Sequence, residues 1–353
     1  MPDPLVVTQA NAFRAALLRR ESAQLRTMTA HWARVERTLE QGISETLDLI
    51  ALQERRGNRR FGRNQGSYLQ LERYQALLRQ TRGELNKFAD YAANSIQQGV
   101  FDFARDGANH AAVQVATVAR EAGVFGGFNR LSVPTVENIA GVLQADAPVG
   151  DLLRRSFPEA AVRMTDALVE GTALGWNPRR TAAAMASSLS DTVLQRTMVI
   201  ARTEQLRAYR TATQEGYRQS GVVIGYKRLA AKSSRTCIAC LLADGQFYAL
   251  GESFSEHPNG RCTLVPVLQG IPASEWTTGR TWFEAQPTAV QRDILGKGAY
   301  NAWQDGAVSL DDLVKRHEHP VWGVSLGKRA LRDAVGVEAA RAYSASAFYT
   351  QDG

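Results

Sequence analysis

Residues 237–262 read CIACLLADGQFYALGESFSEHPNGRC, and they carry the pattern that constrains the fold most. All three cysteines of the chain lie in this stretch, together with one histidine. Two residues separate Cys237 from Cys240, sixteen separate Cys240 from His257, and four separate His257 from Cys262. A Cys-x2-Cys turn places two thiolates on one side of a metal ion, and a returning loop supplies the other two ligands. The spacing predicts a closed, structural zinc site.

Two other interpretations of the same residues stay open at this point. The three cysteines could be buried free thiols beside an unrelated histidine. The Cys-x2-Cys pair could be a redox motif, although the βαβ context of such motifs is missing. A disulfide framework is disfavoured because the number of cysteines is odd. His317 and His319 predict no second metal site, since residues two apart do not share a helix face.

The composition bounds the class of protein. With 353 residues, the chain has room for two or three domains. Hydrophobic residues make up 44% of it, enough for a sizeable core. No run approaches roughly 18 apolar residues, so no membrane association is expected. The N-terminus lacks a basic segment followed by an apolar run, which disfavours secretion by a signal peptide.

A long helix is predicted over residues 5–52. Its apolar residues step by three and four, as in a coiled-coil seam. The seam consists of Leu25, Met28, Trp32, Val35, Leu39, Ile43, Leu47 and Ile50. A second helical face over residues 71–96 could pair antiparallel with the first as a hairpin, and residues 101–122 continue as a helix. Helices this long pack on another long helix, in the same chain or between subunits, so self-association is one possibility.

A basic loop is predicted over residues 54–66, which contain three glycines and five arginines. The five are Arg55, Arg56, Arg59, Arg60 and Arg63. Arginine side chains match phosphate oxygens, so non-specific DNA contact is one interpretation, and a solvated linker is the other. The net charge of +7 is equally ambiguous, because a GC-rich genome also favours arginine codons.

The predicted fold class is mainly α, of α+β type, in three parts. Residues 1–130 form a helical assembly region, residues 131–270 a small zinc-stapled domain, and residues 271–353 a helical C-terminal extension. Within the middle part, Pro134 is expected near a helix start with Ser132 as its cap. A helix over about 190–219 ends at Gly221, and a strand follows.

Several short motifs occur together between residues 200 and 266. They are Ile200-Ala-Arg-Thr-Glu204, Arg207-Ala-Tyr209, Gly221, Arg235-Thr-Cys-Ile-Ala-Cys240, Asp244-Gly245, His257-Pro258, Arg261-Cys262 and Pro266. In this combination, roughly residues 160–267 resemble the phage Mu F-like head morphogenesis domain. Family members often read His-Pro-x-Cys-Arg-Cys, whereas Gly260 occupies the first of those cysteine positions here. The set of zinc ligands then rests on His257 and Cys262, and the fourth ligand is the open position.

The resemblance implies a minor head protein, also called a minor capsid protein, of a tailed phage. Such a protein is a virion component, assembled in the host cytoplasm and located near the portal. It would contact the portal and other head proteins and assist DNA packaging or ejection.

Arg202, Glu204 and Arg207 lie on one predicted helix, where Glu204 and Arg207 are i,i+3 neighbours. They are interpreted as a buried, structural ion-pair network. A catalytic Glu204 is the alternative, but no nucleophile or second acid stands at a suitable spacing, so no enzyme is predicted. Two other functions stay open: an effector of the toxin or ADP-ribosyltransferase type linked to a Mu F-like domain, and a zinc-dependent DNA-binding protein. The first lacks a matching catalytic series, and the second lacks the helix-borne histidine pair of zinc fingers.

Overall fold

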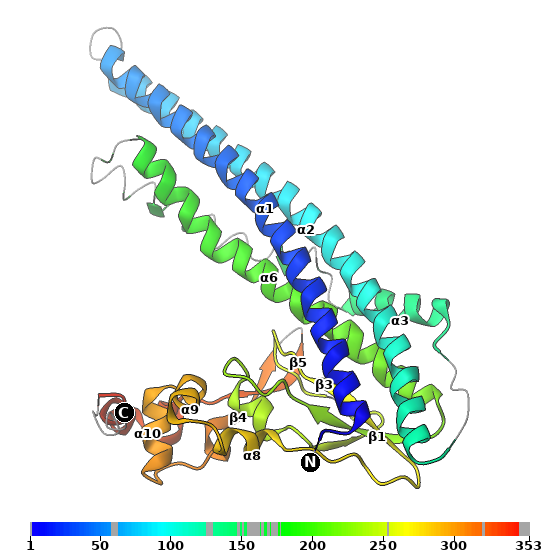
Figure 1. The fold of residues 1–353 in the computed structure, drawn as a ribbon. Helices are drawn as coiled ribbons and strands as arrows, with labels where there is room; N and C mark the ends of the chain where they lie inside the picture. The colour runs from blue at the N-terminus through cyan, green and yellow to red at the C-terminus, as the bar shows by residue number, and fades with distance from the viewer. Residues whose placement is uncertain are drawn as a thin grey trace. The chain divides into compact units, whose positions relative to one another are not determined.

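The computed structural model describes residues 2–57, 63–124, 130–146, 178–252, 254–319 and 322–345, with isolated positions between 149 and 176. These residues are mainly helical, with one three-stranded and one two-stranded sheet (Figure 1). They divide into two compact units. One comprises residues 19–99 and 143–204, and the other residues 1–18, 100–142 and 205–353. The borders predicted at 130 and 270 do not coincide with those of the units.

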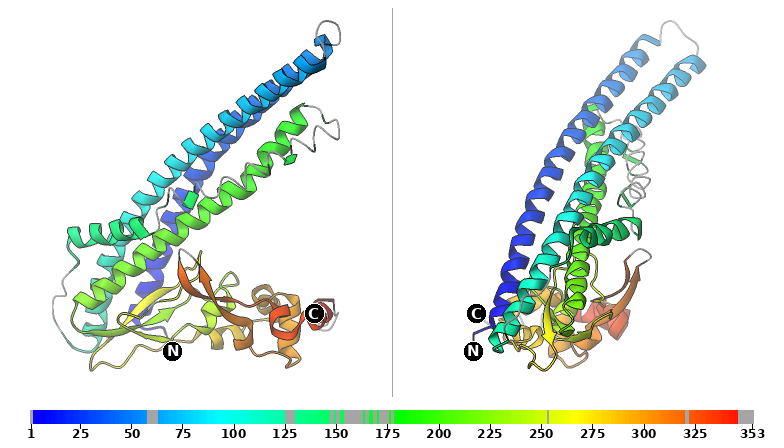
Figure 2. Two further views of the ribbon diagram at one scale, coloured as in Figure 1. Left: turned by 180° about the vertical axis from the view of Figure 1, so that it is seen from behind. Right: turned by 90° about the vertical axis from the view of Figure 1, so that its right-hand side faces the viewer.

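The unit of residues 19–99 and 143–204 contains a helical hairpin. Helix α1 (Leu5–Gly57) and helix α2 (Arg63–Glu121) lie side by side over its length (Figures 1 and 2). The predicted seam is buried from Leu25 to Ile43, and Trp32 packs edge-on against Phe88 with ring centroids 4.9 Å apart. The side-chain amide of Gln24 donates to the Ser95 carbonyl. The pairing within one chain is therefore confirmed, while the side chains of Leu47 and Ile50 lie outside the described residues.

His31 and His110 both stack on aromatic rings. His31 stacks on Tyr91 with ring centroids 3.8 Å apart, within the hairpin. His110 belongs to the other unit, where it stacks on Phe13 at 3.7 Å.

The loop predicted over residues 54–66 is shorter than expected. Helix α1 extends to Gly57 and helix α2 begins at Arg63, so both ends of the predicted loop are helical. Arg59 and Arg60 lie outside the described residues, as do the side chains of Arg55, Arg56 and Arg63. The predicted DNA contact therefore stays a prediction.

The second unit contains a three-stranded antiparallel sheet of order β2-β1-β3. Strand β1 (Val223–Leu229) is central, β2 (Phe247–Ala249) pairs Tyr248 with Tyr226, and β3 (Thr263–Leu268) pairs Pro266 with Tyr226. Strand β1 follows helix α6 (Pro178–Gln219), as predicted. Gly221 separates the two with a φ of +70°, a conformation that glycine adopts without strain.

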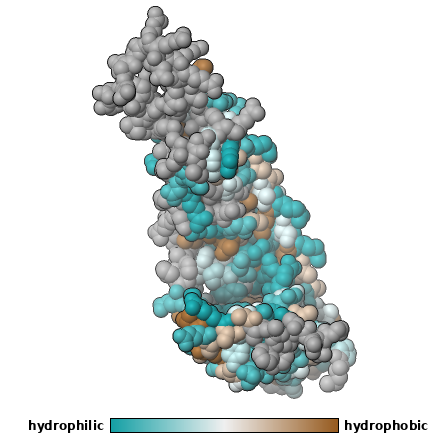
Figure 3. Space-filling view, turned by 90° about the vertical axis from the view of Figure 1, so that its left-hand side faces the viewer, coloured by the Kyte–Doolittle hydropathy of each residue, from teal (hydrophilic) through white to brown (hydrophobic). Residues whose placement is uncertain are grey.

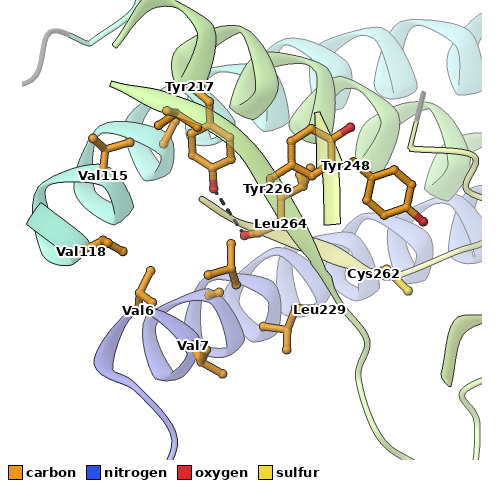
Figure 4. Close-up of a cluster of buried hydrophobic side chains, with 14 of the residues drawn as sticks. Val6, Val7, Val115, Val118, Tyr217, Tyr226, Leu229, Tyr248, Cys262 and Leu264 are labelled. Carbon is orange, nitrogen blue, oxygen red and sulfur yellow. Dashed lines mark hydrogen bonds between the residues drawn. The ribbon is translucent and has the colours of Figure 1, made fainter. Parts of the chain in front are cut away.

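The first hydrophobic core of this unit joins its sheet to the ends of its helices. Val6 and Val7 of α1, Val115 and Val118 of α2, and Tyr217 of α6 surround Leu264 of β3 (Figure 4). The Tyr217 hydroxyl donates to the Gln114 side chain and lies 3.4 Å from the Leu264 carbonyl. The buried Tyr217 hydroxyl therefore has a hydrogen-bond partner, as burial of a polar group requires.

A second core in the same unit involves the C-terminal part of the chain. Four short helices supply buried residues to it: α7 (Ile238–Leu242), α8 (Gly279–Glu284), α9 (Thr288–Leu295) and α10 (Lys297–Gln304). Partly buried residues of α11 (Leu331–Val335) pack against them. The chain ends with α12 (Val337–Ala345). Helices α9 and α10 follow Pro287 and are divided at Gly296, whose φ is +77°.

The C-terminal extension, which was predicted to be helical, contains both short helices and a β-hairpin. A β-hairpin interrupts it, formed by β4 (Val314–His319) and β5 (Gly323–Lys328), after a short 3-10 turn, η1 (Asp311–Leu313). Val314 pairs with Lys328 and His319 with Gly323, so cross-strand pairing overrides the helical pattern.

Helix α3 (Val133–Asp146) begins where the capping signal predicts, because the Ser132 hydroxyl accepts from the Thr135 amide at 3.3 Å. Hydrophilic and hydrophobic residues are intermixed in the coloured part of the face drawn in Figure 3. Within the described ranges, no helix combines the length and apolar character needed to cross a bilayer.

Candidate metal centre

The first two predicted ligands are positioned by one turn of helix. Cys237 caps the N-terminus of α7, and its sulfur accepts from the Cys240 amide at 3.4 Å. The cap turns both thiols to the same side. Ile238 and Leu241 anchor α7 in the second core, whereas Cys240 belongs to the first core. The thiols are therefore held at the junction of the two cores.

The third ligand comes from a tight turn. The Gly260 amide donates to the His257 carbonyl at 3.0 Å, and Asn259 has a φ of +71°, which asparagine tolerates. The Nδ1 atom of His257 lies 2.7 Å from the Pro258 carbonyl, which can only accept. This contact directs Nε2 inward, as outer-shell partners do for metal-binding histidines. Nε2 lies 3.2 Å from the sulfurs of both Cys237 and Cys240.

The predicted ligands come together in two groups that share Cys240. Cys237, Cys240 and His257 form the first, and Cys240, Glu256 and Cys262 the second; within each group the ligand atoms lie within 4.8 Å of one another. The arrangement could hold a metal ion. It also favours the metal-site interpretation over three unrelated buried thiols, because the nitrogen and two sulfurs of the first group converge.

The electrostatics of the group favour one deprotonated thiol, that of Cys237. Hydrogen bonds from the Cys240 thiol and from His257 lower the pKa of Cys237 to about 4, despite burial. The pKa of Cys240 moves in the opposite direction, since Cys240 donates to Cys237. Burial lowers the pKa of His257, but the contacts with Cys237 and Glu256 outweigh it and raise the pKa to about 9. Cys237 and His257 thus form a thiolate–imidazolium pair, in which the proton on His257 supplies the positive charge that a bound cation would supply.

Three charged residues of the site are not among the sequence predictions. Arg228 of β1 and Arg210 of α6 are buried beside the cysteines, and Glu256 is buried between them and His257. Arg228 pairs with Glu256 at 2.9 Å, lies 3.6 Å from the Cys240 sulfur and stacks over Phe254. The signal in the sequence is weak but present: Arg228 is a charge in an otherwise apolar strand, and Glu256 directly precedes the histidine.

The motif residue Asp244 anchors the returning loop. One carboxylate oxygen accepts from the Ala230 amide at 2.6 Å, and the other accepts from the Trp276 indole at 3.1 Å. Lys232 lies 3.4 Å from the second oxygen. The next residue, Gly245, has a φ of +83°, which lets the chain reverse toward β2.

A cavity of about 440 Å³ lies beside the exposed edge of the centre. Cys237 and His257 line one side of it, and His317, Ser325 and Lys328 of the β-hairpin are among the residues that line the other. His317 and His319 share a face of β4, because alternate residues of a strand point the same way. The reason given for excluding them, helix geometry, was wrong; even so, His317 belongs to neither ligand group among the described residues.

The residues of the predicted ion-pair network lie on α6. Glu204 is buried, and Arg202 and Arg207 are half-buried. The partner of Arg202 is Glu21 of α1, in the same unit, with Arg202 Nε 2.5 Å from Glu21 Oε1. The sequence could not reveal this partner, which is 181 positions away.

No family model, curated protein or solved structure matches this chain.

Proposed function

We propose that this chain is a structural head protein of a tailed phage, a minor capsid protein of the Mu F-like kind. It acts near the portal in head morphogenesis and in DNA packaging or ejection, and it is a part of the virion assembled in the host cytoplasm. Its partners are the portal and other head proteins. The proposal rests first on the motifs between residues 200 and 266.

The observation that carries the proposal is the convergence of the cysteine and histidine motifs on one centre. Cys240 and Cys262 are buried in the first core, Cys237 packs against that core, and His257 Nε2 lies 3.2 Å from the sulfurs of Cys237 and Cys240. Asp244 is a buried anchor for the same loop. Four protein donors leave no position open for a substrate on the ion, which is the feature of structural zinc sites. A staple of this kind supports a building part more than a catalyst.

The ion in this proposal is zinc. Thiolates and imidazole are the donors that zinc prefers, and Cys240 and Cys262 are buried. Calcium and magnesium, which take oxygen ligands, are disfavoured by three sulfurs. Zinc bound here would fasten α7 to the turn at His257, and so join the two cores.

The role is tested by finding the protein in particles. Purified virions and procapsids, separated on a density gradient, should contain the chain at low copy relative to the major capsid protein. Mass spectrometry of the gradient fractions measures this. A protein that stays entirely in the unassembled fraction contradicts the proposal.

A variant separates a building part from an enzyme. Glu204→Gln keeps the shape of a buried side chain but removes its charge, so a structural role predicts a lower Tm and proportionally poorer incorporation into particles. Glu215→Gln is the matched control on α6, because Glu215 pairs at the surface with Arg218 and should behave as wild type. A Glu204→Gln protein that is stable and incorporated, but yields non-infectious particles, would favour a catalytic carboxylate instead.

A further inference from the structure

Glu256 is a buried carboxylate that the four-ligand zinc site leaves without a role. Its side chain is only 4% exposed. One oxygen, Oε2, pairs with Arg228 at 2.9 Å. The other, Oε1, points at the candidate ligands and lies 3.5 Å from the Cys240 sulfur and 3.6 Å from His257 Nε2. The carboxylate therefore has one oxygen for the arginine and one for the centre.

These separations match those between ligands of one ion. Ligand atoms bound to tetrahedral zinc at ~2.0–2.3 Å lie roughly 3.3–3.8 Å from each other. The contacts of Glu256 Oε1 with Cys240 and His257 fall in this range. Both Cys262 and Glu256 group with Cys240, and neither is a member of the group formed by Cys237, Cys240 and His257. The contact of Glu256 Oε1 with His257 Nε2 at 3.6 Å is what links the carboxylate to that group.

The glycine at position 260 provides the space for this carboxylate. A β-carbon at Gly260 would lie 2.1 Å from Glu256 Oε1 and 2.2 Å from its Cδ. Any other residue at position 260 would displace the Glu256 side chain. Gly260 is not among the glycines with a positive φ, so its role here is to leave space and not to allow an unusual backbone conformation. The pair Glu256 and Gly260 thus acts as one feature of the site.

A paired arginine holds the carboxylate of Glu256 in place. Arg228 contacts Glu256 Oε2 at 2.9 Å. Arg228 is itself fixed by its donation to the Phe254 carbonyl at 3.2 Å. The ion pair at Oε2 therefore keeps Oε1 directed at Cys240 and His257.

We propose that Glu256 is the fourth ligand of the metal ion, completing a set with Cys237, Cys240 and His257. Cys262 is then a thiol of the outer shell, next to Cys240 and Glu256. This assignment rests on the metal site of the proposed function and changes its donor set from three sulfurs to two.

Cobalt(II) bound to the metal-free full-length protein gives a direct test. Thiolate-to-cobalt charge-transfer absorption grows with the number of bound thiolates, and the visible bands report the geometry. We expect an intensity for two thiolates in the wild type, unchanged in Cys262→Ser. Glu256→Gln should shift the visible bands and weaken cobalt binding by more than about 100-fold, beyond the roughly 10- to 100-fold typical of outer-shell residues.

The opposite pattern overturns the assignment. An intensity for three thiolates that falls by a third in Cys262→Ser, with wild-type bands in Glu256→Gln, would make Cys262 the ligand. A folded wild type that binds neither cobalt nor zinc would instead remove the metal centre as a whole. The two failures are therefore distinguishable.

A double variant keeps the test decisive if Glu256→Gln fails to fold. Glu256→Ala with Gly260→Cys deletes the carboxylate and grows a thiol from a β-carbon that lies at its place. We expect it to bind cobalt at least 10-fold more tightly than Glu256→Ala alone, with the absorption of one added thiolate. Circular dichroism confirms the fold of each variant, and absence of this rescue counts against Glu256 as a ligand.

Discussion

A β-carbon on Gly107 would lie 2.3 Å from the main-chain oxygen of Tyr209, so helices α2 and α6 approach each other more closely than any side chain at 107 permits. The contact is reinforced by Thr213, whose hydroxyl donates to the Tyr209 carbonyl at 2.8 Å and lies 3.4 Å from the Gly107 carbonyl. Only glycine is small enough for position 107, although glycine is unfavourable within a helix.

The variant Gly107→Ala should be destabilised by about 1–3 kcal/mol, because the backbone of one helix has to move. Gly83→Ala, on the same helix, is the matched control, since a β-carbon there has nothing within 4 Å. That variant should gain up to about 1 kcal/mol from helix propensity. Urea unfolding followed by circular dichroism measures both, and equal stabilities would refute the close-approach argument.

Purified protein should contain close to one zinc ion per chain by elemental analysis. Cys237→Ser and Cys240→Ser should lose the metal and unfold locally around α7, because the binding energy of a structural zinc is folding energy. A chelator should lower the Tm of the wild type in the same way, and added zinc should restore it. A fully folded wild type without metal would end this prediction.

Replacing Arg55, Arg56, Arg59, Arg60 and Arg63 by Gln should weaken non-specific DNA binding. If every arginine contacts a phosphate, the negative slope of log K against log salt becomes shallower by about 4–5 units. The control replaces five exposed arginines of α1 instead: Arg19, Arg20, Arg26, Arg34 and Arg37. It makes the same change in net charge, so a slope that responds equally to both sets would show general attraction rather than contact by the segment around residue 60.

Breaking the ion pair between Glu21 and Arg202 should lower stability. Glu21 is 2% exposed and Arg202 16%, so Glu21→Gln should cost about 3 kcal/mol, near the lower end for a buried pair. Glu40→Gln, exposed on the same helix, should change stability by less than about 0.5 kcal/mol. A double-mutant cycle with Arg202→Met isolates the coupling, and additive effects would show that the two side chains do not interact.

The local parts of the fold could be predicted from the sequence, because their causes lie within a few residues. The seam from Leu25 to Ile43 repeats at helical spacing and is buried as expected. Ser132 caps α3, and Gly221 separates α6 from β1. Helix ends that are set by a local cap or glycine were therefore predicted correctly. The ends of the segment around residue 60 were predicted wrongly, because its glycines do not stop the helices.

The C-terminal hairpin shows where local pattern fails. Residues 314–328 carry no strong alternation of polar and apolar residues, and only the pairing of β4 with β5 gives them extended structure. For that reason His317 and His319 lie on one face of a strand, whereas a helix would have placed them on different faces.

The candidate metal centre was likewise predicted in part from the sequence, and the rest of it depends on the tertiary structure. The spacing of the cysteines and histidine was enough to select Cys237, Cys240, His257 and Cys262 as candidate ligands. Glu256 directly precedes His257, but only the tertiary structure shows that its carboxylate faces the cysteines and pairs with Arg228. Arg228 and Arg210 come to the centre from a strand and a helix outside the 237–262 segment. A sequence specifies local conformation through each residue and its neighbours, but the partner of a buried charge is decided by which elements pack together.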